Sequence, residues 1–443
     1  MPLAGLSIGK RSALLLDKEN MTKYSISPMS SLYELYLRHP RISTDSRRIE
    51  PDSVFFALRG ASFDGNRFVN EALAKGAAWA VADDPAAAGT DARVLVVDDT
   101  LRTLQELART HRRTLGIPIL AVAGSNGKTT TKELTSRVLG SRFALHATRG
   151  NLNNHIGVPL TLLAMTPDTE FGIVEMGASA CGEIAGLASI AEPDYGILTN
   201  IGRAHLEGFG GPEGIRRGKG ELFDYLAAHG GLAFVPDEDP TLVAMAAERP
   251  SLRVERYSRT LADNIPSHLE GEYNRYNIAA AAAIGRHFGI PDADIRRAVA
   301  GYIPDNNRSQ RTETRRNTLI VDCYNANPSS MRASVANFLN EGLGCRTRRL
   351  LILGDMLELG EWSCGEHAAI IRQATQDPKA EVWLVGSEFE RAWQSLEEHP
   401  ARVRRFASCG ELTEELHARP VEGALVLLKG SRGIGLERAL EAL

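Results

Sequence analysis

The chain has 443 residues, 43% of them hydrophobic and 24% charged, and its formal net charge is −4. This composition is typical of a globular enzyme with several domains and gives no support to non-specific nucleic-acid binding. Five scattered cysteines without a C-x-x-C pair indicate a reducing compartment with neither a disulfide framework nor a zinc site. Because no apolar run is long enough for a membrane span, we expect a cytoplasmic enzyme without membrane insertion.

The first predicted domain, residues 29–115, follows an N-terminal extension, residues 1–28, that shows no clear periodicity. Apolar residues at helical spacing, short apolar runs and turn residues predict alternating elements in this domain. The predicted helices are 30–37, 68–76 and 101–115, the strands are 54–58, 77–82 and 94–97, and residues 59–66 form a loop. The run Thr44-Asp-Ser-Arg47 is either a capped turn or a set of hydroxyl and guanidinium donors for a phosphate.

A glycine-rich segment, Gly124-Ser-Asn-Gly-Lys-Thr-Thr130, lies near the start of the second predicted domain, residues 116–304. It stands between a predicted strand at 117–122 and a predicted helix at 132–139. There, backbone N–H groups and a helix N-terminus can hold a phosphate, Lys128 can reach the β and γ phosphates, and the Thr129 hydroxyl can hold Mg²⁺. The alternative is a glycine-rich turn with one surface lysine, but its place after an apolar strand favours nucleotide binding.

Polar residues follow two further strands of this domain. Glu175 ends a predicted strand at 170–176, and His205 follows one at 197–201. Since ligands bind outside the carboxyl ends of parallel strands, both are candidate Mg²⁺ ligands beside Thr129, although a lone histidine is more often structural.

Two further segments of the second domain carry candidate polar groups. Asn151, Asn153 and Asn154 are suited to bind a polar ligand, although asparagine is also common in turns. Lys219 has the pattern of an ordinary helix-surface lysine. A strand at 232–235 and a helix at 278–288 complete this domain.

The third predicted domain, residues 305–443, alternates strands with helices, which indicates a doubly wound, mostly parallel sheet. Its predicted strands are 318–322, 349–355, 382–386 and 425–429. Asp322, Asp355 and Lys429 fall at strand ends. A turn-forming loop, Tyr324-Asn-Ala-Asn-Pro328, precedes a predicted helix at 331–339.

In their order along residues 30–443, these motifs resemble the Mur ligases. The Asn-Leu-Asn-Asn and Tyr-Asn-Ala-Asn-Pro stretches are similar to the branch that adds D-alanyl-D-alanine. Further matching motifs are Val174-Glu-Met-Gly177, Thr199-Asn-Ile-Gly-Arg-Ala-His-Leu-Glu-Gly-Phe209, Lys219-Gly-Glu-Leu222, Gly354-Asp-Met-Leu-Glu-Leu-Gly360 and Lys429-Gly-Ser-Arg432. In this light the shortened glycine loop, with Val122 where the strict G-x-x-x-x-G-K-[ST] pattern has glycine, fits an amide ligase better than a general NTPase.

The resemblance implies a fold of three α/β domains: a small UDP-substrate domain, a central ATP-binding domain of the P-loop type and a Rossmann-like C-terminal domain. It implies an ATP-dependent ligase that joins D-alanyl-D-alanine to UDP-N-acetylmuramoyl-tripeptide through an acyl phosphate, with ATP and Mg²⁺ as cofactors. We expect a monomer without a nucleic-acid partner. A ligase for a different amino acid and a non-catalytic nucleotide-binding protein are the alternatives, and the third residue of the tripeptide stays open.

The resemblance also implies residue roles. The catalytic residues would be Lys128, Glu175, His205 and Lys219, and the metal site would use Thr129, Glu175, His205 and Lys219. Nucleotide binding would use Gly124, Ser125, Asn126, Gly127, Lys128, Thr129, Thr130, Asn277, Arg308 and Asp322. Substrate binding would use Ser46, Arg47, Asn151, Asn153, Asn154, Asn325, Asn327 and Asp355.

Lys219 matches a lysine that the family carbamylates, which converts a cation repelled by Mg²⁺ into an anionic oxygen ligand. Two departures from the family pattern concern the adenine side: Tyr273 replaces a histidine before Asn274, and Pro236 stands before Asp237 where the family often has an asparagine.

Overall fold

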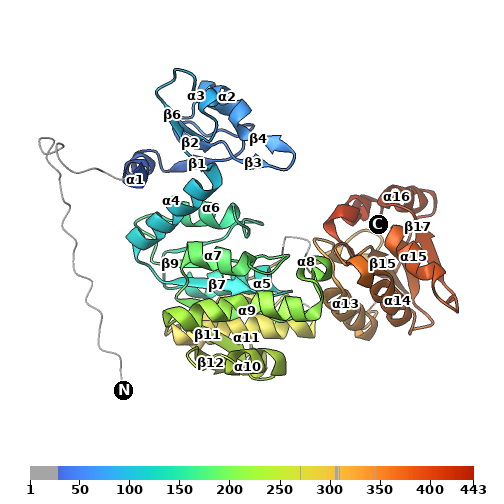
Figure 1. Ribbon diagram of the computed structural model, residues 1–443. Coiled ribbons are helices and arrows are strands. Elements are labelled where there is room, and N and C mark those ends of the chain that lie inside the picture. Colours follow the sequence, from blue (N-terminus) through green and yellow to red (C-terminus); the bar gives the residue numbers. More distant parts are fainter. Residues whose placement is uncertain (1–27, 270, 305–307, 309, 345) are drawn as a thin grey trace, which may run out of the picture.

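The computed structural model describes residues 28–269, 271–304, 308, 310–344 and 346–443. Three α/β domains, each built on a mostly parallel sheet, confirm the predicted fold class, and the first and third domains both adjoin the central one (Figure 1). The predicted domain limits stay predictions. Apart from Pro28, where α1 (Pro28–Arg38) begins, the predicted N-terminal extension lies outside the described residues. In the described part of the chain, no helix has the length and apolar character that a bilayer crossing requires.

The first domain is built on a four-stranded parallel sheet in the order β1-β2-β5-β6. The strands are β1 (Arg41–Ser43), β2 (Ser53–Phe56), β5 (Trp79–Ala82) and β6 (Val94–Val96), and the further helices are η1 (Gly65–Phe68), α2 (Val69–Ala74), α3 (Pro85–Ala88) and α4 (Thr100–Leu115). The segment 59–66, predicted to be a loop, contains the short hairpin β3 (Arg59–Gly60) and β4 (Phe63–Asp64).

The central domain has a six-stranded sheet in the order β12-β11-β10-β7-β9-β8, with every neighbouring pair parallel. The strands are β7 (Ile119–Ala123), β8 (Leu145–Ala147), β9 (Phe171–Glu175), β10 (Tyr195–Leu198), β11 (Leu232–Pro236) and β12 (Arg253–Tyr257). The four inner strands confirm the predicted ones. The edge strands β8 and β12 were not predicted, because their partly exposed sequences lack a continuous apolar run.

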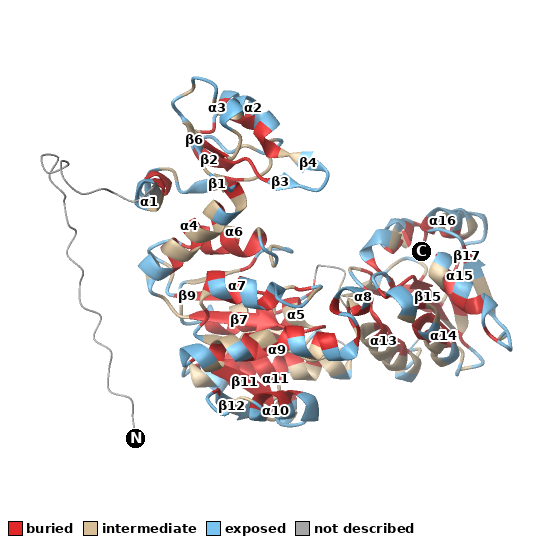
Figure 2. Cartoon of the chain, viewed as in Figure 1, coloured by how far each residue is buried: buried red, intermediate tan, exposed pale blue. Residues whose placement is uncertain are grey.

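Helices cover both faces of this sheet, which is why its inner strands are apolar throughout. Along β7, Leu120 and Val122 belong to the apolar cluster that includes residues of α5, α11 and α12, whereas Ile119 and Ala121 belong to the cluster that includes residues of α6, α7 and α9. Figure 2 shows the buried strands between these helices. The helices are α5 (Lys128–Leu139), α6 (Gly157–Leu163), α7 (Glu183–Ala191), α8 (Leu206–Phe209), α9 (Pro212–His229), α10 (Pro240–Ala247), η2 (Arg259–Ala262), α11 (Glu272–His287) and α12 (Asp292–Ala300).

The C-terminal domain has the strand order β13-β14-β18-β15-β16-β17, in which β13 alone of the described strands is antiparallel to its neighbour. The strands are β13 (Gln310–Glu313), β14 (Thr318–Asp322), β15 (Arg348–Gly354), β16 (Glu381–Val385), β17 (Val403–Phe406) and β18 (Ala424–Lys429). The helices are α13 (Pro328–Asn340), η3 (Gly360–Trp362), α14 (Ser363–Ala374), α15 (Ser387–Gln394), α16 (Cys409–Ala418), η4 (Arg432–Ile434) and η5 (Leu436–Ala442).

Strand register explains why polar groups gather at two sheet edges. In the central sheet Val122 pairs with Glu175, so the glycine loop begins beside this carboxylate. In the C-terminal sheet Asp322 pairs with Lys429. Figure 1 shows α8, at the carboxyl edge of the central sheet, lying next to the C-terminal domain. Residues distant in sequence are therefore brought to one junction.

Candidate active site

A cavity of about 890 Å³ lies at this junction. The central domain lines it with the glycine loop, the asparagine segment 150–155, the segments after β9 and β10, and the first turns of α11. The C-terminal domain contributes Arg308, Asp322, Tyr324, Asn325, Asn327, Ser329, Ser330, Ala333, Ser334, Glu358 and Lys429. A polar cavity between two domains is where a ligand that needs groups from both would bind.

The glycine loop depends on glycine at two positions. Gly124 has φ +128°, and a Cβ there would lie 2.1 Å from the Thr199 hydroxyl oxygen. Gly127 has φ +79°, and its Cβ would lie 2.5 Å from Oδ1 of Asn277. Helix α5 begins directly after Gly127, so Lys128 and Thr129 belong to its first turn; the helix predicted from residue 132 starts four residues earlier in the structure. The first-turn N–H groups therefore face the cavity, as anion binding requires.

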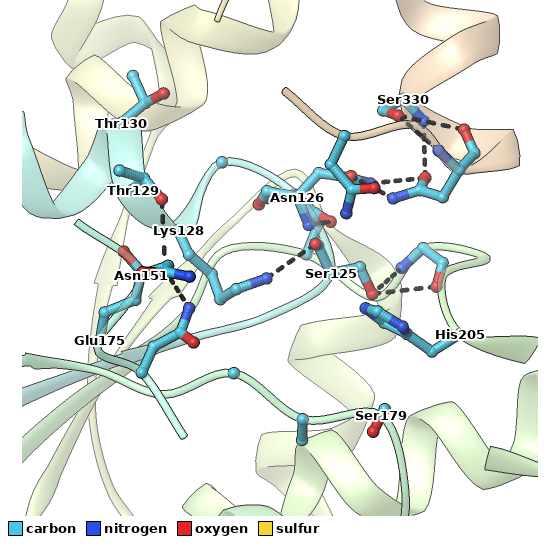
Figure 3. Close-up of a pocket in the computed structure, with 18 of the residues that line it drawn as sticks. Ser125, Asn126, Lys128, Thr129, Thr130, Asn151, Glu175, Ser179, His205 and Ser330 are labelled. Atoms are coloured by element: carbon cyan, nitrogen blue, oxygen red, sulfur yellow. Dashed lines mark hydrogen bonds between the residues drawn. The ribbon is translucent and has the colours of Figure 1, made fainter. Parts of the chain in front are cut away.

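Lys128 is folded back over its own loop. Its Nζ donates to the carbonyl oxygen of Gly124 at 2.8 Å and to that of Ser125 at 3.0 Å. Figure 3 shows the bond to Ser125. Burial lowers the pKa of Lys128 to about 8, the charge of Arg308 adds to this effect, and Glu175 opposes it. The side chain is therefore mostly cationic at neutral pH, and a phosphate would offer stronger acceptors than the two carbonyls do.

Glu175 presents an incompletely satisfied carboxylate. It is 2% exposed, and its Oε1 accepts hydrogen bonds from Asn153 Nδ2 at 2.8 Å and Thr129 Oγ1 at 3.3 Å. Its buried Oε2 accepts no hydrogen bond from any residue that the structure describes. An unpaired anionic oxygen beside a hydroxyl is costly unless a cation completes it, and hard oxygen donors suit Mg²⁺. These residues therefore fit a magnesium ion.

The structure does not bring His205 to Glu175. The His205 Nδ1 instead contacts the carboxylate of Glu358 in the C-terminal domain. Figure 3 shows Glu175 and His205 on opposite sides of Lys128. Burial lowers the pKa of His205, while Glu358 opposes that effect. No group of three or more His, Cys, Asp or Glu side chains able to hold a metal is present among the described residues.

Lys219 corrects the prediction of a surface lysine, because it is 1% exposed. Its Nζ donates to the Ala178 carbonyl at 2.9 Å and lies 4.9 Å from the centre of the Phe209 ring. Burial, together with the charge of Lys128, lowers the pKa of Lys219 to about 7. The available sequence signal was a glycine on each side: a Cβ at Gly218 would lie 2.5 Å from the Phe209 ring. The small residues let neighbouring elements close over the lysine.

The predicted asparagines of the central domain line the cavity, and some of them also hold neighbouring elements in place. Asn151, Asn153 and Asn154 all line the cavity. Asn153 binds Glu175, while the Asn154 side chain accepts from the N–H groups of Ile156 and Gly157 just before and at the start of α6. Asn277, in α11, accepts from the Thr131 hydroxyl at 3.1 Å and donates to Asn274 at 2.8 Å. Asn277 therefore fixes α11 against the start of α5.

The C-terminal wall combines an ion pair with a stacked guanidinium. Asp322 accepts from Lys429 Nζ at 2.6 Å and from the Ser334 hydroxyl at 2.8 Å. Burial alone would raise the pKa of Asp322, but these two partners outweigh it and leave the pKa below its ordinary value. Arg308 stacks on Tyr324, with the guanidinium carbon 4.0 Å from the ring centre. This wall therefore offers charged groups to a polar ligand.

Three predicted substrate residues are not among the described residues that line the cavity. Asp355 is buried, and its carboxylate accepts from the N–H groups of Glu388 at 2.9 Å and Phe389 at 2.8 Å. The prediction that Asp355 binds substrate at the cleft is thus corrected, because its carboxylate holds the first turn of α15. Ser46 and Arg47 lie in the turn after β1, where Arg47 pairs with Asp45. Their role in UDP binding stays a prediction.

Sequence reasoning missed several cavity residues. Ser179, Glu183, Ser329, Ser330 and Glu358 all line it. Glu358 has φ +61°, an uncommon conformation for a residue with a side chain. Neither strand ends nor glycine patterns mark these positions, because each reaches the cavity from a loop or a helix start.

Family models match three stretches of the chain. The model described as Mur ligase family, catalytic domain, matches residues 40–112, Mur ligase middle domain matches 122–265, and Mur ligase, glutamate ligase domain, matches 307–432. The UDP-N-acetylmuramoyl-tripeptide–D-alanyl-D-alanine ligase of Bacillus subtilis strain 168 is 34% identical, covering 91% of this chain and 92% of the relative. The ligase of the same name from Escherichia coli K12 is 32% identical, covering 91% and 93%.

Solved structures of ligases are also similar to this chain. A crystal structure of MurF from Acinetobacter baumannii has a TM-score of 0.79 and 30% identity, covering 90% of this chain and 92% of that one. The MurF ligase of Thermotoga maritima in complex with ADP has a TM-score of 0.79 and 26% identity, covering 92% and 97%.

Proposed function

The chain belongs to the Mur ligase family of ATP-dependent ligases, and from that premise we propose that it joins D-alanyl-D-alanine to UDP-N-acetylmuramoyl-tripeptide. The product would be the UDP-muramoyl-pentapeptide precursor of peptidoglycan. The observation that carries this proposal is the likeness, over nine tenths of the chain, to ligases that bear this name. The cavity supports it, because groups suited to phosphate and Mg²⁺ line one wall and a second domain lies opposite. With ATP and a UDP-linked precursor as substrates, we expect the enzyme to act in the cytoplasm as a monomer.

The proposed chemistry has two steps. The terminal carboxylate of the tripeptide attacks the γ-phosphorus of ATP, an acyl phosphate forms, and ADP leaves. The amine of D-alanyl-D-alanine then attacks the acyl carbon, and inorganic phosphate and a proton leave as the amide forms. Because water would hydrolyse the acyl phosphate, the reaction benefits from a cavity enclosed between domains.

The residues of the central domain have distinct proposed tasks. Lys128 would exchange its two loop carbonyls for the β and γ phosphates of ATP, and the first-turn N–H groups of α5 would add donors. Thr129 and the unpaired Oε2 of Glu175 would hold Mg²⁺, which when bound neutralises charge that develops on the phosphates. His205 would join that site only after leaving Glu358.

Lys219 has the environment that carbamate formation needs. With its pKa near 7, a large fraction of the buried amine is neutral at physiological pH and able to attack CO₂, releasing a proton as the N–C bond forms. The resulting carbamate would be an anionic oxygen ligand next to Ala178. Lys219→Ala should lose most activity, and a short-chain carboxylate in the buffer should restore part of it. Full activity without rescue would exclude this role.

On the C-terminal wall, Arg308 and Asp322 would contact the nucleotide, and Asn325 and Asn327 the substrates. An assay of phosphate release that depends on D-alanyl-D-alanine, run with tripeptides ending in diaminopimelate or lysine, tests the whole proposal. Lys128→Ala should abolish release, while Lys379→Ala, at an exposed lysine of the C-terminal domain that does not line the cavity, should not. Turnover with a single diamino acid but not with the dipeptide would favour a different ligase of the family. Phosphate release unaffected by Lys128→Ala would overturn the catalytic assignment.

A further inference from the structure

A buried carboxylate joins the central and C-terminal domains outside the cavity. Glu366, in α14, has a side chain only 6% exposed. Its Oε1 lies 3.0 Å from Nε of Arg203, which belongs to the central domain, and its Oε2 is bound by Arg332 of α13. One carboxylate is thus shared by guanidiniums from two domains. Glu366 is buried, whereas the Arg203 and Arg332 side chains are 41% and 38% exposed, so both pairs are stronger than fully exposed ones but are partly screened by water.

Further hydrogen bonds in this region of contact between the two domains, called the seam below, connect the C-terminal domain directly to the glycine loop. Asn126 and Asn327 exchange two side-chain hydrogen bonds, at 2.7 and 3.4 Å. The Asn126 backbone is itself fixed, because its carbonyl accepts from Thr199 and Asn200. The N–H of Arg203 donates to the Ser329 hydroxyl at 2.8 Å. The first turn of α13 is therefore placed against the loop that holds Lys128.

The backbone of the seam is shaped for close approach. His205 and Glu358, which contact each other across it, both have left-handed φ angles, +54° and +61°. Such conformations persist where surrounding contacts enforce them. Gly360 has φ +55°, and a Cβ there would lie 3.2 Å from the Glu207 side chain. Half-buried Trp362 packs on Gly211, where a Cβ would lie 3.3 Å from its ring.

We propose that Arg203, Glu366 and Arg332 form an interdomain latch that holds the C-terminal domain on the glycine loop before substrates bind. Neither Arg203 nor Glu366 is among the described residues that line the cavity, so they act as positioning residues. This inference rests on the proposed function for its kinetic consequence: a substrate that needs both domains binds only the docked population, so its apparent affinity falls in proportion when that population falls. Groups that contact substrate stay intact, so turnover at saturation is preserved.

The kinetic test compares Arg203→Ala and Glu366→Gln with a matched control, Glu381→Gln, which breaks the Arg348–Glu381 ion pair inside the C-terminal domain. The two latch variants should raise the KM for D-alanyl-D-alanine about tenfold and leave kcat within about twofold. The double variant should be no worse than the more affected single one, because both remove the same contact. The control should leave both constants unchanged. Unchanged KM in the latch variants, or an equal rise in the control, would overturn the latch.

Trp362 gives a readout that needs no activity. Its emission, obtained as the difference between each protein and its Trp362→Phe counterpart, should shift to longer wavelength in Arg203→Ala and not in Glu381→Gln. Arg203 is partly exposed, so its truncation should leave each domain folded, which circular dichroism would verify. If the unaltered protein releases no dipeptide-dependent phosphate, the proposed function fails while the emission shift still supports the latch. Normal activity with no emission shift in Arg203→Ala would refute the latch alone.

Discussion

Two glycines flank Lys219 in α9, and replacing each of them by alanine should affect the stability of the protein differently, which tests the packing around this lysine. Gly218 and Gly220 both lie inside the helix, and neither has a positive φ. Replacing glycine by alanine in a helix interior stabilises by about 1 kcal/mol when nothing obstructs the methyl group. The difference between the two positions therefore comes from what each new Cβ meets.

At Gly218 the new Cβ would lie 2.5 Å from the Phe209 ring and 3.3 Å from Cα of Cys181. The ring is packed, and the second neighbour is backbone, so overpacking costs about 1–3 kcal/mol. Subtracting the helical gain, we expect Gly218→Ala to destabilise by about 1 kcal/mol. Because Phe209 also lies next to Nζ of Lys219, activity should fall as well.

At Gly220 the nearest atom is the end of the Arg249 side chain, 2.8 Å away, followed by the Met245 methyl group at 3.3 Å. Neither contact is with backbone, but the Arg249 guanidinium is held by Asp224 and by the Met245 carbonyl, so moving it offsets the helical gain and Gly220→Ala should be about neutral. The two variants should thus differ by about 1 kcal/mol, which thermal unfolding of the transition that contains the central domain would resolve. Equal stabilities, or a more stable Gly218→Ala, would refute the packing argument.

Three further predictions follow from the same geometry. Glu175→Gln should reduce phosphate release at least about 100-fold without lowering the unfolding temperature, because it removes an unpaired buried charge; activity above a tenth of the original would contradict its role. Because the pKa of Lys219 is lowered to about 7, the unfolded state binds more protons than the folded state between about pH 7 and 10.5, so the stability of the protein should rise with pH in that window. In CO₂-depleted buffer Lys219→Met should be more stable than the unaltered protein near pH 7, and the difference in stability should shrink by about 1.4 kcal/mol per pH unit. A difference that stays constant with pH would contradict the assignment. Asp355→Asn should lower stability by about 1–3 kcal/mol, since its amide group would face the α15 N–H groups, while the KM for each substrate stays unchanged; a large rise in KM with normal stability would return Asp355 to the substrate site.

The amino-acid sequence by itself determined the local parts of the site. The apolar run that forms β7 and the glycines after it specify a strand and a phosphate-type loop through short-range propensity, and the helix that follows was predicted as well, although from residue 132 rather than from Lys128. The placing of Glu175 at a strand end followed from the same periodicity. The order of motifs was enough to predict the family, which the matched family models confirm.

Only the tertiary structure decided which of these groups meet. The burial of Lys219 depends on Phe209 and on the loop at Ala178 closing over two glycines, and no helical pattern within α9 encodes it. His205 is directed to Glu358 rather than to Glu175, and Asp355 serves α15 rather than the cleft, because each side chain is claimed by a partner from a different element. Propensity acts over a few residues, whereas the partner of a polar side chain is set by how domains pack. The sequence therefore predicted the candidate groups, and packing between elements decided which partner each group contacts.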